Sequence, residues 1–140
     1  MFLRTLALGS ALTVACAFGA NAAMITYHAT LTAAQEVPPT TSTGTGSATA
    51  VLDTATHELT VDMTFSGFTS AVTAAHIHGP AAAGKNAGVL VPLGNAPASP
   101  IHVMAKLTPE QEKELAGGML YVNIHSKNHP GGAIRGQLTK

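Results

Sequence analysis

Apolar and polar residues alternate along much of the chain, most clearly from Glu58 to Phe65. In that stretch Leu59, Val61 and Met63 alternate with polar residues. A period of two is typical of a β-strand with one buried face. A similar segment, Ser47 to Leu52, precedes it across four turn-forming residues, so the pattern predicts a β-hairpin.

Six further segments have the composition of short strands, separated by connections rich in Gly, Pro and Asn. They are Met24 to Ala33, Val72 to His78, Gly88 to Leu93, Ile101 to Leu107, Met119 to His125 and Ala133 to Leu138. About eight short strands in a chain of this length favour an all-β fold, an antiparallel Greek-key β-sandwich or barrel.

One short helix is expected to interrupt the strands. Thr108 and Gln111 have the spacing of a capping box, and Pro109 stands where the first helical residue would be. Gly117 and Gly118 can end this helix after about two turns.

The beginning of the chain predicts export from the cytoplasm. Arg4 is followed by an apolar stretch from Leu6 to Phe18 and by Ala20-Asn21-Ala22, a small-x-small cleavage pattern. We therefore expect residues 1–23 to be a signal peptide, residues 24–140 to form one domain, and the protein to be periplasmic or secreted. The apolar stretch is short for a transmembrane helix, and no later segment resembles one. A lipoprotein signal ending at Cys16 is the alternative.

Composition narrows the possible functions. Cys16 is the only cysteine, so no disulfide is expected. The formal net charge is zero and the basic residues are scattered, which argues against nucleic-acid binding. The sequence contains no G-x-S-x-G nucleophile motif and no phosphate-binding glycine loop.

Histidine is the residue type that points to chemistry, with seven in the chain. His76 and His78 are two residues apart on a predicted strand, so both project from one face while Ile77 projects from the other. On a second predicted strand, His125 lies opposite the apolar face. If the two strands are neighbours, these three imidazoles form a metal site, with His129 in the following loop as a fourth candidate. Imidazole nitrogens suit copper or zinc, and tetragonal nitrogen sites favour Cu(II).

Simpler interpretations of the same residues remain open. A histidine pair on an outward strand face is often only solvated, and His28, His57 and His102 are more naturally surface residues than ligands. The methionines at 24, 63, 104 and 119 could bind Cu(I), but Met63 has the spacing of a core residue. Arg135 could guide a small anion toward an open metal position, although a plain surface role fits equally well.

Three segments resemble the CHRD (chordin-like) family: LTAAQEVPP at 31–39, AHIHGPA at 75–81 and LYVNIHSKNHPGGAIRGQL at 120–138. The resemblance implies an exported, mostly antiparallel sandwich and leaves function open. A weaker similarity is to copper/zinc superoxide dismutase, which implies a dismutase-like fold, copper on His76, His78 and His125, and superoxide guidance by Arg135. The sequence has neither a zinc loop nor a bridging histidine between Gly79 and Pro100, so zinc is not expected.

The leading hypothesis is an exported copper-binding CHRD protein and, if it is an enzyme, a copper-only superoxide dismutase. One alternative is copper buffering or delivery without turnover. Another is a metal-free extracytoplasmic interaction module whose protein partner the sequence does not identify.

Overall fold

The computed structural model describes residues 22–140, so Cys16 and residues 1–21 of the predicted signal peptide lie outside the described part. Eight strands, one 3-10 turn and one α-helix follow each other along the chain. They are β1 (Met24–Leu31), η1 (Ala33–Gln35), β2 (Thr45–Asp53), β3 (Glu58–Ser66), β4 (Val72–His78), β5 (Val89–Asn95), β6 (Ile101–Lys106), α1 (Pro109–Ala116), β7 (Tyr121–Ser126) and β8 (His129–Gln137).

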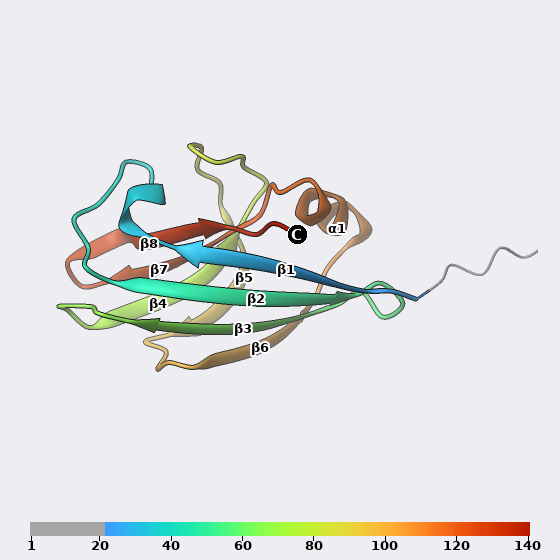
Figure 1. Cartoon of the computed structure of the whole chain (residues 1–140), viewed down its shortest axis with the longest axis horizontal. Helices are drawn as coiled ribbons and strands as arrows, with labels where there is room; N and C mark the ends of the chain where they lie inside the picture. The colour runs from blue at the N-terminus through green and yellow to red at the C-terminus, as the bar shows by residue number, and fades with distance from the viewer. Residues whose placement is uncertain (1–21) are drawn as a thin grey trace, which may run out of the picture.

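The strands form two antiparallel sheets packed as a β-sandwich (Figure 1). The first sheet has the order β1-β2-β3-β6 and the second β5-β4-β7-β8. Because β5 contacts β6 across the gap and β7 returns beside β4, the connections follow a Greek key. At the other side the main chain of His28 pairs with Thr139, and that of Thr32 pairs with Arg135. Within residues 22–140 the sheets remain two layers, so the fold is a sandwich and not a closed barrel.

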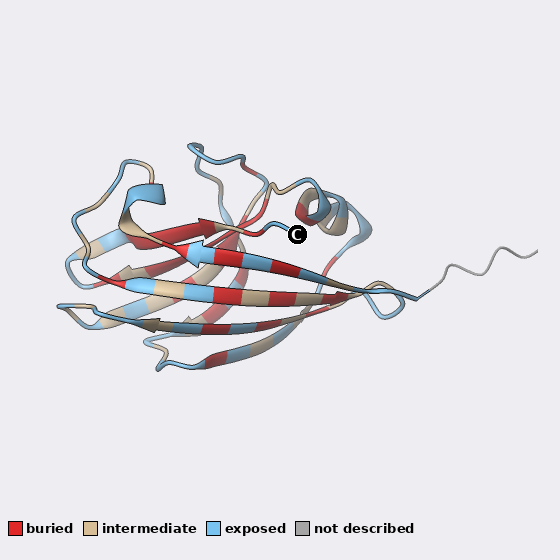
Figure 2. Ribbon diagram, in the orientation of Figure 1, coloured by how far each residue is buried: buried red, intermediate tan, exposed pale blue. Residues whose placement is uncertain are grey.

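The core lies between the two sheets and is almost entirely apolar. Leu59, Val61 and Met63 face it from β3, as their alternation predicted, and Ile77 and Ile124 face them from the second sheet. Figure 2 shows the resulting alternation of buried and exposed residues along β1, β2 and β3. Burial of these side chains supplies the main stabilisation of a domain without disulfides.

Local sequence signals produce the predicted hairpin and helix. Strands β2 and β3 pair from Asp53↔Glu58 onward, and the turn between them is held by the Asp53 carboxylate, which accepts a hydrogen bond from the amide of Ala55. The capping box at the start of α1 is present in both directions between Thr108 and Gln111. The predictions of a hairpin and of a short helix are therefore confirmed.

One local expectation was wrong. His129 was expected in a loop after β7, but it is the first residue of β8 and pairs with Ser126 across a two-residue turn. Its strand begins before Gly131 and Gly132, because two glycines and Pro130 do not prevent pairing at the edge of a sheet. No helix of the described residues is long and apolar enough to cross a membrane.

Candidate metal centre

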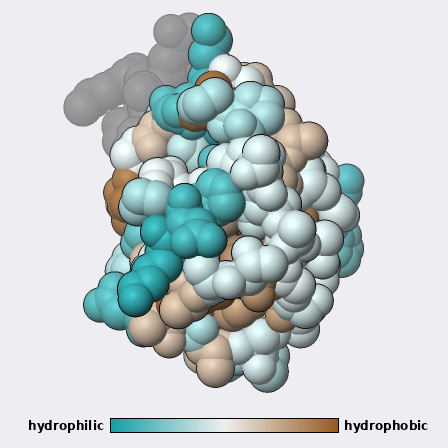
Figure 3. All heavy atoms as spheres, turned by 90° about the vertical axis from the view of Figure 1, so that its left-hand side faces the viewer, coloured by the Kyte–Doolittle hydropathy of each residue, from teal (hydrophilic) through white to brown (hydrophobic). Residues whose placement is uncertain are grey.

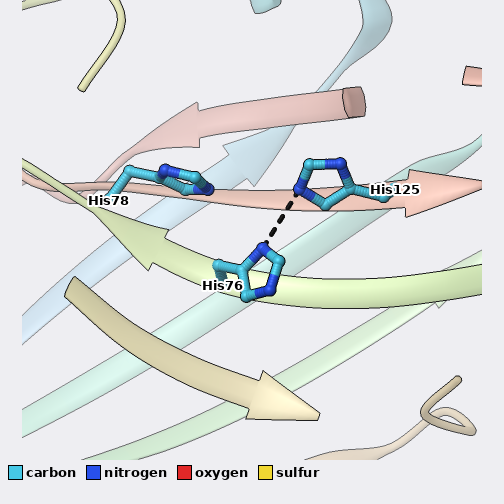
Figure 4. Close-up of side chains that lie close together, drawn as sticks. All are labelled: His76, His78 and His125. Atoms are coloured by element: carbon cyan, nitrogen blue, oxygen red, sulfur yellow. Dashed lines mark hydrogen bonds between the residues drawn. The ribbon is translucent and has the colours of Figure 1, made fainter. Parts of the chain in front are cut away.

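Three histidines from two neighbouring strands converge on the outward face of the second sheet. Strands β4 and β7 pair antiparallel, with His76 opposite Asn123 and His78 opposite Tyr121. The two histidine strands are therefore neighbours, which is the condition that the sequence analysis set for a three-histidine site. His125 lies opposite Ala74, so all three imidazoles project from the same face (Figure 4). One ligating nitrogen from each of His76, His78 and His125 lies within 4.8 Å of the other two.

Hydrogen bonds to the main chain orient the rings of His78 and His125 and so determine which nitrogen of each ring points toward the other histidines. His125 donates from Nδ1 to the carbonyl of Pro130 at 2.8 Å, which leaves Nε2 without its proton, 3.1 Å from Nδ1 of His76. His78 places Nδ1 3.0 Å from the carbonyl of Ala87 and Nε2 3.0 Å from Oδ1 of Asn123, so its Nε2 can bind a metal ion only in place of the contact with that amide oxygen. An imidazole held through its other nitrogen is typical of a metal ligand, because that bond fixes both tautomer and ring orientation.

Burial favours the neutral, metal-binding form of His76 and His78. Desolvation lowers the pKa of His76, and the neighbouring His125 and His78 lower it further. Desolvation also lowers the pKa of His78, although its bonds to Ala87 and Asn123 act in the opposite direction. Neutral imidazoles at neutral pH present lone pairs, and a metal ion can bind them without first displacing a proton.

A tyrosine ring and an arginine side chain stack beside His78. Its ring stacks on Tyr121, with ring centroids 5.0 Å apart and planes within 5° of parallel. The guanidinium of Arg135 lies 3.5 Å from the centre of the same tyrosine ring, on the neighbouring strand β8. Arg135 is only 1% exposed and donates to Asn86, Ala82 and Gln137. Arg135 therefore supports the tyrosine ring on which His78 stacks. Its guidance of an anion stays a prediction.

Sequence reasoning missed a buried carboxylate. Glu36 is 6% exposed, and its Oε1 has no hydrogen-bond partner among the described residues. It lies next to Asn123, whose Oδ1 is 3.0 Å from Nε2 of His78. Desolvation raises the pKa of Glu36, and nearby Arg135 and Asn123 oppose that shift. Glu36 belongs to the motif at 31–39, but nothing in the local pattern marks it as buried.

The other histidines lie outside this cluster. His129 lines a cavity of about 430 Å³ between β8 and the segment 36–41, and its role as a fourth ligand stays a prediction. His57 is bonded to Glu112 and His102 to Asp62, both at 2.6 Å, on other parts of the sandwich. Figure 3 shows the end of the molecule that lies on the left of Figure 1, where a band of strongly hydrophilic residues lies beside weakly polar and hydrophobic ones.

The family model of the CHRD domain matches residues 27–138, which covers nearly the whole described structure. The chain belongs to the CHRD family. No curated protein and no solved structure matches it. CHRD domains are typically extracellular, and in this one the histidine cluster on β4 and β7 has the donors and spacing to hold a metal ion.

Proposed function

We propose that this CHRD protein is exported to the periplasm or beyond and binds one copper ion through His76, His78 and His125. The observation that carries the proposal is the convergence of three imidazole nitrogens within 4.8 Å on a rigid pair of strands. Main-chain carbonyls accept hydrogen bonds from Nδ1 of His78 and of His125, so these two rings are already oriented before an ion binds.

Donor chemistry favours copper over other ions. The cluster offers only imidazole nitrogen, which suits copper, zinc, iron and nickel, and excludes the oxygen-seeking magnesium and calcium. Among divalent first-row metals the affinity of such a site is greatest for Cu²⁺. No cysteine lies in the described residues to shift the preference toward a structural zinc site.

For the reaction, we propose dismutation of superoxide. Copper would supply a one-electron couple, so that one superoxide is oxidised to oxygen and another is reduced to hydrogen peroxide with two protons from solvent. Three protein ligands leave a position open for a small molecule, which is the arrangement of catalytic rather than structural metal sites. The chain's own contribution is to hold His78 against the ring of Tyr121, which Arg135 supports, and to favour the neutral form of His76 and His78.

A second candidate, copper storage or delivery, is favoured by one contact. The amide oxygen of Asn123 lies 3.0 Å from Nε2 of His78, close enough to compete for the remaining coordination position. A copper ion enclosed in this way would bind tightly and turn over slowly. The same experiment separates the two candidates.

The test measures metal content and the Cu(II) electron paramagnetic resonance spectrum of the purified protein after exposure to copper or zinc separately. The central variant replaces His76, His78 and His125 with alanine, and the matched control replaces His28 and His57, two histidines outside the cluster. We expect about one copper per chain, a nitrogen-rich spectrum, and loss of both in the central variant alone.

A superoxide assay on the copper-loaded protein then distinguishes the candidates. Catalysis well above that of the central variant supports a dismutase, whereas tight binding with negligible turnover supports storage. If the central variant binds copper as the wild type does, the histidine cluster is not the copper site and the proposal is wrong. The remaining interpretation is then an interaction module whose histidine cluster holds no metal.

A further inference from the structure

A histidine and a methionine lie two residues apart on the opposite layer of the sandwich, at the edge strand β6. Along this strand Ile101 faces the core, whereas His102 and Met104 face solvent from the outer surface of the first sheet. Met104 is 56% exposed, although a thioether gains free energy from burial. The two side chains are two residues apart, so they project from the same face with Cα atoms roughly 6.6 Å apart.

A carboxylate on the neighbouring strand orients the histidine. Strand β3 pairs with β6 so that Asp62 lies directly opposite His102. Nδ1 of His102 is 2.6 Å from Oδ1 of Asp62. Because an ionised carboxylate can only accept, Nδ1 donates to Asp62, and Nε2 is the nitrogen that a ligand can reach. A carboxylate that holds one nitrogen of an imidazole while the other binds a metal is a recurring arrangement.

We propose that His102 and Met104 form a surface site for monovalent copper, with Asp62 as the positioning residue. A thioether is a soft donor that selects Cu(I), and imidazole binds copper in either oxidation state. Cu(I) accepts as few as two ligands, and both side chains are long enough to place nitrogen and sulfur on either side of one ion. The negative charge of Asp62 also favours a cation at this place.

The proposal is independent of the histidine cluster on β4 and β7. That cluster lies on the outward face of the second sheet, so the core separates the two sites. The cluster offers nitrogen alone and suits Cu(II), whereas the β6 pair adds sulfur and suits Cu(I). Because imidazole binds copper in either oxidation state, the β6 pair is titrated both in the full protein and in the variant that lacks His76, His78 and His125.

The test is a titration with Cu(I) under anaerobic conditions, and in parallel with Ag(I), followed by NMR of methionine methyl groups in the full protein. Met24 provides an internal control, because it is 68% exposed on β1 and has no histidine two residues away. We expect the methyl signal of Met104 to shift at the first added equivalents while that of Met24 stays in place. We expect the variants His102→Ala and Met104→Leu each to bind Cu(I) at this site at least tenfold more weakly. Each variant should therefore bind one Cu(I) fewer at the concentrations that fill the wild-type site.

Asp62→Asn tests the positioning role, since it keeps the size of the side chain but removes the charge. We expect it to retain the shift of the Met104 signal at a several-fold higher Cu(I) concentration. Equal shifts at Met24 and Met104, or an unchanged Cu(I) stoichiometry in Met104→Leu, would overturn the proposal. Neither result depends on the Cu(II) spectrum that tests the β4 and β7 cluster.

Discussion

The substitution Gly132→Ala tests whether the buried polar residues beside the histidine cluster are as tightly packed as the structure indicates. Gly132 has a φ of +132°, a region that side chains other than glycine rarely adopt. A Cβ at this position would lie 2.6 Å from Oε1 of Glu36 and 2.9 Å from Nδ2 of Asn123. Both distances are below any normal contact, and both atoms belong to buried side chains.

The expected loss of stability has two parts. An unfavourable φ costs roughly 1–3 kcal/mol, and forcing an extra carbon into a packed site costs roughly 1–3 kcal/mol. We therefore expect the free energy of unfolding to fall by about 2–6 kcal/mol. Because Asn123 contacts His78, the displaced amide should also weaken the copper binding that we propose for the histidine cluster.

Chemical denaturation followed by circular dichroism measures this loss, and the chain provides a matched control next to the site. A Cβ added at Gly131 would meet no atom within 4 Å, so Gly131→Ala should change the free energy of unfolding by less than about 0.5 kcal/mol. If both variants unfold at the same denaturant concentration, the packing of Glu36 and Asn123 against Gly132 is not as described.

Two further predictions concern charge in the site. The pKa values of His76 and His78 are lowered in the folded protein. The unfolded chain therefore binds more protons below pH 6.5. The stability of the metal-free protein should fall as pH decreases through that value. Denaturation at several pH values measures this slope, which should flatten when both histidines are replaced with alanine. The pKa of Glu36 is raised, so its ionised form is disfavoured in the folded state. Glu36→Gln removes this charge, and at about pH 7.5 the denaturant concentration at which half of the protein is unfolded should stay the same or rise. A loss of more than about 1 kcal/mol in that variant would contradict this assignment of charge.

Much of the fold and the three histidines could be predicted from sequence because they follow local patterns. Alternation determines which face of a strand is buried, so placing Ile77 in the core also places His76 and His78 together on the outer face. The same argument applied to β7 places His125 opposite the face of Val122 and Ile124. Only the adjacency of the two strands had to be assumed.

The buried charges could not be predicted, because they depend on contacts between distant segments. Glu36 and Arg135 are charged residues next to loop-forming sequence, which ordinarily indicates exposure. Both are buried because residues 36–41 and the connection from β4 to β5 fold over the outer face of the second sheet. Neither contact leaves a periodic signal in the sequence.

The two sheets have different outer faces, and this difference explains where the histidine cluster lies. The outer positions of β2 and β3 carry mostly Thr, Ser and acidic residues that stay at least partly exposed, so their chemistry is that of solvated groups. Strand β7, in contrast, is buried at every position except His125, because loops cover its outer face while the core covers the inner one. The buried Asn123 on that strand and His78 on β4 are therefore desolvated and hydrogen-bonded to each other, and His125 is oriented by the carbonyl of Pro130. Shortening the loop between β4 and β5 would remove the carbonyl of Ala87 and the bonds to Arg135, and with them the orientation of His78.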